Sequence, residues 1–206
     1  MNILGHASIA LATGHDDPAY VLGAVLPDIA SMATVRLDRS RLTGLLAEGV
    51  RLHLATDAAF HAHPDFQRGA AAIRRNLADR GVHRGPARAV GHAGWELLLD
   101  GTLVGSPAES EYWRSLGAGE QALDAISEPD RPRWISFLDH RDRRPALRYD
   151  DPLWVAERLY SMLARRPRLR LPWEQVPAVA QVLESHAGPV AAVAAEVVGT
   201  TAAGLR

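Results

Sequence analysis

The sequence contains no cysteine and no lysine among its 206 residues. The absence of cysteine excludes disulfide bonds, thiolate zinc sites and cysteine nucleophiles. Without lysine, all 23 basic residues are arginine, which we interpret as a bias toward G+C-rich codons rather than as a preference for guanidinium–phosphate contacts. The 24 acidic residues leave a formal net charge of −1, so the chain as a whole attracts neither nucleic acid nor acidic lipid.

Long apolar runs are also missing. No segment reaches the roughly 20 apolar residues that a membrane-spanning helix needs. The apolar N-terminal segment MNILGHASIALATGH has no basic leader and contains His6, which favours a structural helix over a signal peptide. We therefore expect no transmembrane segment, no nucleic-acid partner and a cytoplasmic location.

Strand signals are scarce, whereas helical periodicity recurs along the chain. A hydrophobic fraction of 47% supports the core of one ordinary domain over residues 1–206. We predict an all-α fold, a compact multi-helix bundle whose last eight or so residues (about two helical turns) fray. The helices are expected at 2–13, 18–26, 41–60, 65–80, 86–104, 151–164, 173–184 and 188–198, with short helices and solvated loops in 107–150.

Two helical segments repeat one polar pattern. In GVRLHLATDAAFHAH, His53 and Asp57 are four residues apart, and in AVGHAGWELLLDG the same spacing separates His92 and Glu96. Positions four apart stack on one face of a helix. Two such helices packed together would direct imidazoles and carboxylates at a common point, as metal-binding bundles do. The alternative for each pair is a surface ion pair or a capping interaction.

Two further polar residues stand in apolar surroundings. His6 lies beside Ile3, Leu4 and Ile9, and Asp28 follows Pro27 in VLGAVLPDIA. Pro27 indicates a helix end or a tight turn that directs Asp28 inward, where an unpaired carboxylate is costly and a cation would offset its burial. The alternatives are a core histidine for His6 and a helix cap for Asp28.

Three more candidate site residues lie near these pairs in the sequence. Asp100 lies four residues beyond Glu96, and it could be a ligand, a partner that orients a histidine or an exposed carboxylate at the helix end. His61 and His63 lie beside Pro64, and we interpret them as loop residues in preference to ligands.

These motifs carry a family resemblance over nearly the whole chain, although it is patchy between 105 and 145. MNILGHASIALA, LGAVLPD, GVRLHLATDAAFHAHPDF and SMLARRPRL resemble the acyl carrier protein phosphodiesterase family, a divergent branch of the helical HD-type metal-dependent phosphohydrolases. The chain departs from that family at Leu54, where arginine is usual, and at His92 and Glu96, which replace two aspartates. The ordered set of His6, Pro27-Asp28, His53/Asp57 and His92/Glu96 is also similar to the zinc-dependent phospholipase C-like hydrolases, another all-helical group.

Both resemblances imply metal-assisted hydrolysis of a phosphodiester, with an acyl carrier protein or a phospholipid as substrate. The implied ligands, not all on one ion, are His6, Asp28, His53, Asp57, His92 and Glu96. Imidazole and carboxylate suit zinc or manganese, with iron as a further option. Asp57 or Asp100 would accept a proton from the attacking water.

The run RRPRLRLP bears on the substrate. Arg165, Arg166 and Arg168 could dock a phosphate or an acidic partner, but a solvated basic segment is the preferred interpretation. Two other kinds of protein remain open: a non-catalytic helical protein that holds a metal or serves as a scaffold, and a helical iron oxygenase or oxidase that uses the same ligand types.

Overall fold

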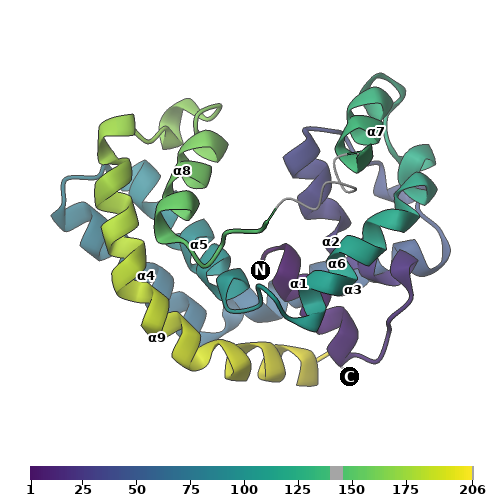
Figure 1. The fold of residues 1–206 in the computed structure, drawn as a ribbon, viewed down its shortest axis with the longest axis horizontal. Helices are drawn as coiled ribbons and strands as arrows, with labels where there is room; N and C mark the ends of the chain where they lie inside the picture. Colours follow the sequence, from purple (N-terminus) through teal and green to yellow (C-terminus); the bar gives the residue numbers. More distant parts are fainter. Residues whose placement is uncertain (140–145, 206) are drawn as a thin grey trace. The chain divides into compact units, whose positions relative to one another are not determined.

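The regular structure is helical, which confirms the predicted all-α class; the HD-like subclass stays a prediction. The computed structural model describes residues 1–139 and 146–205, and within them only an isolated bridge between Leu37 and Ile126 has β geometry. Residues 140–145, part of the expected short-helix region, lie outside the described residues. The helices in Figure 1 are α1 (Ile3–Ala12), α2 (Pro18–Ala33), α3 (Gly44–Ala62), α4 (Pro64–Asp79), α5 (Arg84–Gly101), α6 (Pro107–Ser115), α7 (Arg131–Asp139), α8 (Pro152–Leu163) and α9 (Val176–Ala203).

Short 3₁₀ helices connect several of these elements. They are η1 (Arg39–Arg41), η2 (Leu116–Ala125), η3 (Glu128–Asp130), η5 (Pro167–Leu169) and η6 (Trp173–Gln175). None of the helices in the described part of the chain combines the length and the apolar character required to cross a membrane.

The chain divides into two compact units. The first comprises Met1–Ala59, Gly105–Leu147 and Val198–Arg206, and the second comprises Phe60–Val104 and Arg148–Val197. The residues of α3 and of α9 are each shared between the two units. The single domain expected from chain length is thus organised in two parts, and each is described by itself below.

Pairs of a capping residue and a proline begin four of the helices. Proline suits the first helical position because its missing N–H would have no partner there, and the preceding side chain accepts a free backbone N–H. Asp17, for example, accepts from the Ala19 amide at 2.8 Å. The pairs stand before α2, α4, α6 and α8: Asp17-Pro18, His63-Pro64, Ser106-Pro107 and Asp151-Pro152.

In the described part of the chain, Pro27 and Pro189 lie in helix interiors, and the predicted helix ends at these places are wrong. The second helix was expected to end before Pro27 but continues to Ala33, and Pro189 lies within α9, where two helices were predicted. An interior proline costs about 3 kcal/mol. In α2, burial on both sides of the proline, at Leu26 and Ile29, offsets this cost. The last helix also extends to Ala203, into the segment expected to fray.

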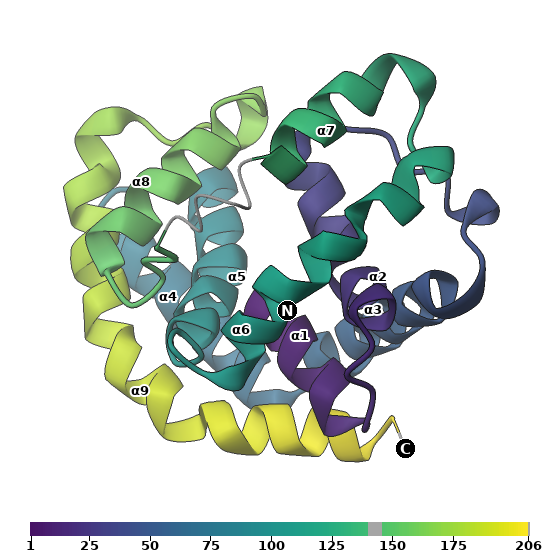
Figure 2. The ribbon, with the colours of Figure 1, turned by 45° about the vertical axis from the view of Figure 1, so that its right-hand side comes forward.

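The first unit is built around α2. The N-terminal helix α1 packs against α2 and α6, and α6 also packs against α2. Figure 2 shows α1 and α6 side by side although about a hundred residues separate them in the sequence. Leu4, Ile9, Leu22 and Leu26 are fully buried in this core.

Two glycines bring α2 and α3 into backbone contact in the first unit. A Cβ atom at Gly23 would lie 2.3 Å from the Leu46 carbonyl oxygen, and one at Gly49 would lie 2.1 Å from the Tyr20 carbonyl oxygen. No side chain larger than hydrogen fits at such distances. This contact fixes the position of α3, which carries His53 one turn beyond Gly49.

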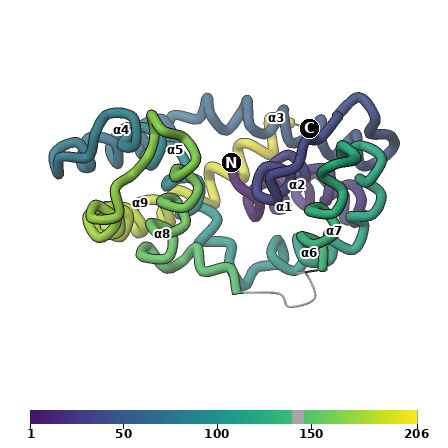
Figure 3. The backbone as a smooth tube through the Cα atoms, turned by 90° about the horizontal axis from the view of Figure 1, so that it is seen from above, coloured from purple at the N-terminus to yellow at the C-terminus, as the bar shows by residue number. Residues whose placement is uncertain are grey.

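The second unit is centred on α5. Helix α4 packs along α5, and α8 packs on α5 as well, an arrangement that Figure 3 shows from above. Aromatic rings of Phe60, Phe66 and Trp95 form its core, with ring centroids 4.6 Å apart for the two phenylalanines. Gly69 leaves room for Trp95, because a Cβ there would lie 2.1 Å from the indole nitrogen.

We predict that Gly23→Ala and Gly49→Ala each lower the free energy of unfolding by about 3 kcal/mol or more, because the added methyl group meets a backbone atom that cannot move alone. The matched control is Gly199→Ala in α9, where a Cβ atom meets nothing within 4 Å. This variant should gain about 0.5–1 kcal/mol from helix propensity. Urea denaturation followed by circular dichroism measures the free energy of unfolding of each variant. Equal stability of the three variants would contradict the close contact.

Candidate metal centres

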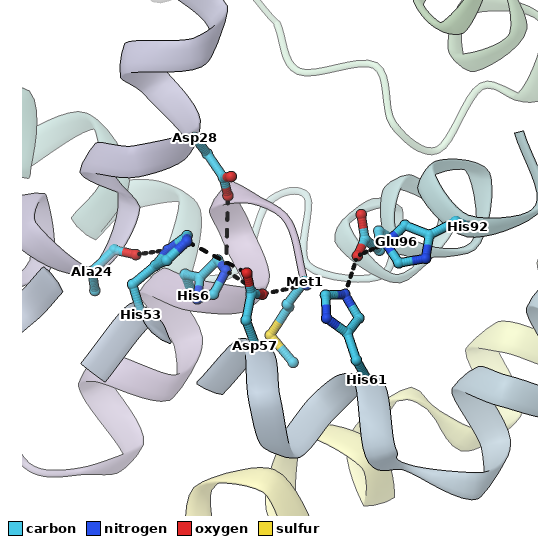
Figure 4. Close-up of polar contacts among 9 residues, drawn as sticks. All are labelled: Met1, His6, Ala24, Asp28, His53, Asp57, His61, His92 and Glu96. Carbon is cyan, nitrogen blue, oxygen red and sulfur yellow. Dashed lines mark hydrogen bonds and ion pairs between the residues drawn. The ribbon is translucent and has the colours of Figure 1, made fainter. Parts of the chain in front are cut away.

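Four of the predicted ligands meet inside the first unit, and we call them the first cluster: His6, Asp28, His53 and Asp57. His6 comes from α1, Asp28 from α2, and His53 and Asp57 from successive turns of α3. Figure 4 shows the four side chains directed at one another. The imidazole rings of His6 and His53 are stacked, with centroids 3.9 Å apart.

The distances within the first cluster are those of a small polar site. Nε2 of His6 lies 3.2 Å from Oδ1 of Asp57 and 3.8 Å from Oδ2 of Asp28. Nε2 of His53 lies 3.5 Å from Oδ2 of Asp57. One ligand atom each from His6, Asp28 and His53 fall within 4.8 Å of one another. These three donors are therefore close enough to share one cation after small side-chain movements.

Backbone contact orients His53. Its Nδ1 lies 2.8 Å from the Ala24 carbonyl oxygen. A carbonyl only accepts, so Nδ1 carries the proton and donates, which leaves the Nε2 lone pair directed at the cluster. Histidine ligands of metals are typically held in this way by a bond from the other ring nitrogen.

His6 is the most deeply buried member. Its side chain is 0% exposed, and neither ring nitrogen makes a hydrogen bond within the described residues. A buried nitrogen without a hydrogen bond costs free energy. Its Nε2 lies beside two carboxylates, and a cation bound there would use the lone pair. The donor set of the first cluster thus fits a divalent metal.

Burial sets the charge of the imidazoles. Desolvation lowers the pKa of His6 to about 3 and also lowers the pKa of His53. Both rings are accordingly neutral at pH 7, the state in which imidazole binds a metal.

Asp57 carries the negative charge of the cluster. Burial by itself would raise its pKa, but the contact with His6 and the ammonium group of Met1 hold that pKa well below its usual range. The Met1 ammonium donates to Oδ1 at 2.9 Å. About 30% of the side chain of each carboxylate is exposed, 28% for Asp28 and 31% for Asp57. Both carboxylates are therefore partly exposed, although Oδ2 of Asp28 is itself buried, and the imidazoles are buried.

A second cluster lies inside the second unit and consists of His61, His92 and Glu96. Oε1 of Glu96 lies 2.9 Å from Nε2 of His61 and 3.3 Å from Nε2 of His92. Burial would raise the pKa of Glu96, but contacts with the two imidazoles keep it well below its usual range. The His92 side chain is half exposed. Two nitrogens and one carboxylate within 4.8 Å of one another could hold a metal.

Of the six predicted ligands, His6, Asp28, His53 and Asp57 lie in the first unit, and His92 and Glu96 lie in the second. The interpretation of Asp28 as a cap is wrong, because it lies inside α2. The assignment of His61 to a loop is also wrong. Helix α3 continues to Ala62, since the restriction that Pro64 imposes falls on the residue just before it. The four-residue step from Asp57 to His61 was the signal for this.

The other candidates join neither cluster. Asp100 is fully buried near the end of α5, so its expected contact with the attacking water gains no support. His63 caps α4, with Nδ1 accepting from the Asp65 amide at 3.2 Å, which confirms that it lies outside the helices. Arg165, Arg166 and Arg168 are exposed, as a solvated basic segment would be.

No protein-family model, curated protein or solved structure matches this chain. These comparisons therefore give no function, and the proposals below start from the chemistry of the side chains that the structure brings together.

We predict that the stability of the metal-free protein falls as the pH drops from 6.5 to 4. In this range the unfolded chain protonates His6, whereas the folded chain does not until about pH 3. Folding then excludes a proton, so the free energy of unfolding decreases with falling pH, by at most about 1.4 kcal/mol per pH unit for this group. Asp57 acts in the same direction only below its ordinary pKa of 3.8.

Urea denaturation at several pH values, with a chelator present, tests this expectation. A His6→Asn variant should show a shallower dependence over the same range, whatever its absolute stability. Identical slopes for the two proteins would mean that His6 is protonated in the folded state.

For the second cluster we predict that His61→Ala removes one equivalent of bound zinc, because it deletes one of two nitrogen donors. His63→Ala is the matched control, since this nearby histidine accepts a hydrogen bond from the Asp65 amide at the start of α4. Equilibrium dialysis followed by elemental analysis gives the zinc content. Equal zinc content in the two variants would exclude His61 as a ligand.

Proposed function

We propose that this protein is a metal-dependent hydrolase of phosphodiesters and that the first cluster is its active site. The observation that carries the proposal is the pairing of two buried neutral imidazoles, His6 and His53, with two partly exposed carboxylates. Nitrogen and carboxylate donors of this kind suit zinc or manganese. The exposed carboxylate side leaves an approach for water and for a substrate.

His6, Asp28 and His53 would hold the ion, with Asp57 beside them. A bound divalent cation supplies Lewis acidity, which lowers the pKa of a coordinated water toward 7 and offsets charge on the phosphoryl oxygens. The bond to Ala24 keeps the His53 lone pair available at Nε2. Asp57 is a weak base because of its low pKa. It is therefore better suited to hold the cation or to orient a water than to remove a proton from it.

The resemblance to acyl carrier protein phosphodiesterases bears on the substrate. Its motifs contain His6, Asp28, His53 and Asp57, the same four residues that make up the first cluster. This coincidence supports a phosphodiester substrate, with an acyl carrier protein as the first candidate. A phospholipid, as in the zinc-dependent phospholipase C-like hydrolases, is the alternative.

A second function is favoured by one contact. The Met1 ammonium already supplies a positive charge to Asp57, so the first cluster could bind a metal, or remain metal-free, as a purely structural element. A protein of this kind would show no turnover. Measuring metal content and hydrolysis in the same samples separates the two functions.

We predict that the purified protein, loaded with Zn²⁺ or Mn²⁺, hydrolyses bis(p-nitrophenyl) phosphate and that Asp28→Asn loses both one equivalent of metal and at least about 100-fold in rate. The reason is that the amide keeps the size of the side chain but removes the anionic ligand. Asp124→Asn is the matched control, because this exposed carboxylate of the same unit lies in η2 outside the cluster.

His53→Ala extends the test to the imidazole side and should also lose metal and turnover, with helicity checked by circular dichroism. Metal retained at the wild-type level in both variants would exclude the first cluster. Metal lost without any turnover in the wild-type protein would favour the structural alternative.

A further inference from the structure

A pocket in the second unit has a lining that includes none of the ligands of either cluster. It has a volume of about 380 Å³ and lies between the C-terminal half of α4 and the N-terminal half of α5. Its lining consists of four arginines and two alanines: Arg74, Arg75, Arg84, Arg88, Ala78 and Ala87. The volume lies in the lower part of the range of about 300–1,000 Å³ that small-molecule sites occupy.

Among the residues that the structure describes, the four guanidinium groups have no acidic partners. None of them forms an ion pair or a hydrogen bond with any residue that the structure describes. Other arginines of the chain do form such pairs, for example Arg68 with Asp65 and Arg114 with Glu111. Like charges gathered around one pocket repel each other. An anion held between them would remove that repulsion and supply the missing acceptors.

Backbone packing brings the two pairs of arginines together. A Cβ atom at Gly91 would lie 2.7 Å from the Ala70 carbonyl oxygen and 3.2 Å from Cβ of Arg74. Because α5 approaches α4 so closely at Gly91, Arg74 of α4 lies near the turn of α5 that contains Arg88. Arg84 and Arg88 are one helical turn apart and share a face of α5. The pocket thus rests on two rigid helices rather than on a loop.

Helix α5 continues the same face toward the second cluster. Arg84, Arg88, His92 and Glu96 follow at intervals of four residues, and each interval advances about 6 Å along a helix axis. Exposure falls along this face, from the exposed arginines to the partly buried Glu96. A ligand anchored by Arg88 would extend along α5 toward His92.

We propose that this pocket binds a phosphate or diphosphate group, either as the inorganic anion or as part of a small organic molecule. Guanidinium forks match phosphate oxygens in two-point contacts, which favours phosphate over a single carboxylate. The alanines leave an apolar floor for the remainder of an organic ligand. This binding site is independent of the hydrolase assignment, which concerns the first cluster.

Isothermal titration calorimetry with inorganic pyrophosphate tests the proposal on the full chain. A chelator keeps the protein metal-free, so that binding cannot arise from an ion in either cluster. We expect saturable binding that Arg88→Gln and Arg74→Gln each weaken about tenfold, since each substitution removes a charge-assisted contact. Arg80→Gln, an exposed arginine of the same region that bonds only to the Asn76 carbonyl, should change the affinity less than about twofold.

The remaining outcomes separate the alternatives. Adenosine diphosphate that binds more tightly than pyrophosphate identifies an organic phosphate, whereas equal affinities identify the inorganic anion; both support the pocket. Equal weakening in all three variants would indicate a diffuse charge effect and overturn the proposal, as would the absence of saturable binding. Binding to vesicles of anionic lipid that pyrophosphate fails to displace would also overturn it. A failure of metal-dependent hydrolysis would leave these measurements unaffected.

Discussion

The hydrogen bond between His53 and the Ala24 carbonyl is the interaction on which the first cluster depends. It decides which ring nitrogen faces Asp57, and it exists only because α2 and α3 touch at Gly23 and Gly49. Larger residues at these glycines would push the two helices apart. The hydrogen bond between Nδ1 of His53 and the Ala24 carbonyl would then be lost. The glycine at position 49 therefore determines how His53, one turn further along α3, is oriented.

Burial gives this site its chemical character at the expense of stability. Removing His6 and His53 from water keeps them neutral. His6 makes no hydrogen bond within the described residues, and such a buried imidazole is destabilising. Asp57 stays ionised because positive and polar groups surround it. A metal would relieve these costs, since it uses both the lone pairs and the negative charge. Stability and metal binding are in this way linked at the same four residues.

Local spacing predicted the parts of the site that a single helix determines. The four-residue steps of His53/Asp57 and His92/Glu96 place each pair on one face whatever the fold, and the structure confirms this. Which pairs meet depends on helix packing, which the spacing does not contain. The same limit applies to Pro27, where tertiary burial outweighs a strong local signal, and to His61, whose partner Glu96 is 35 residues away.

Net charge is a poor guide to the local field in this protein. A formal charge of −1 argues against a global attraction to anions, yet the described carboxylates and arginines are unevenly paired. Asp57 and Glu96, for example, contact histidines, whereas Asp65 and Glu111 pair with arginines. Four further arginines gather at one pocket without acidic partners among the described residues. Positive charge is thus concentrated at one place in a protein that is nearly neutral on average, and such a concentration attracts anions.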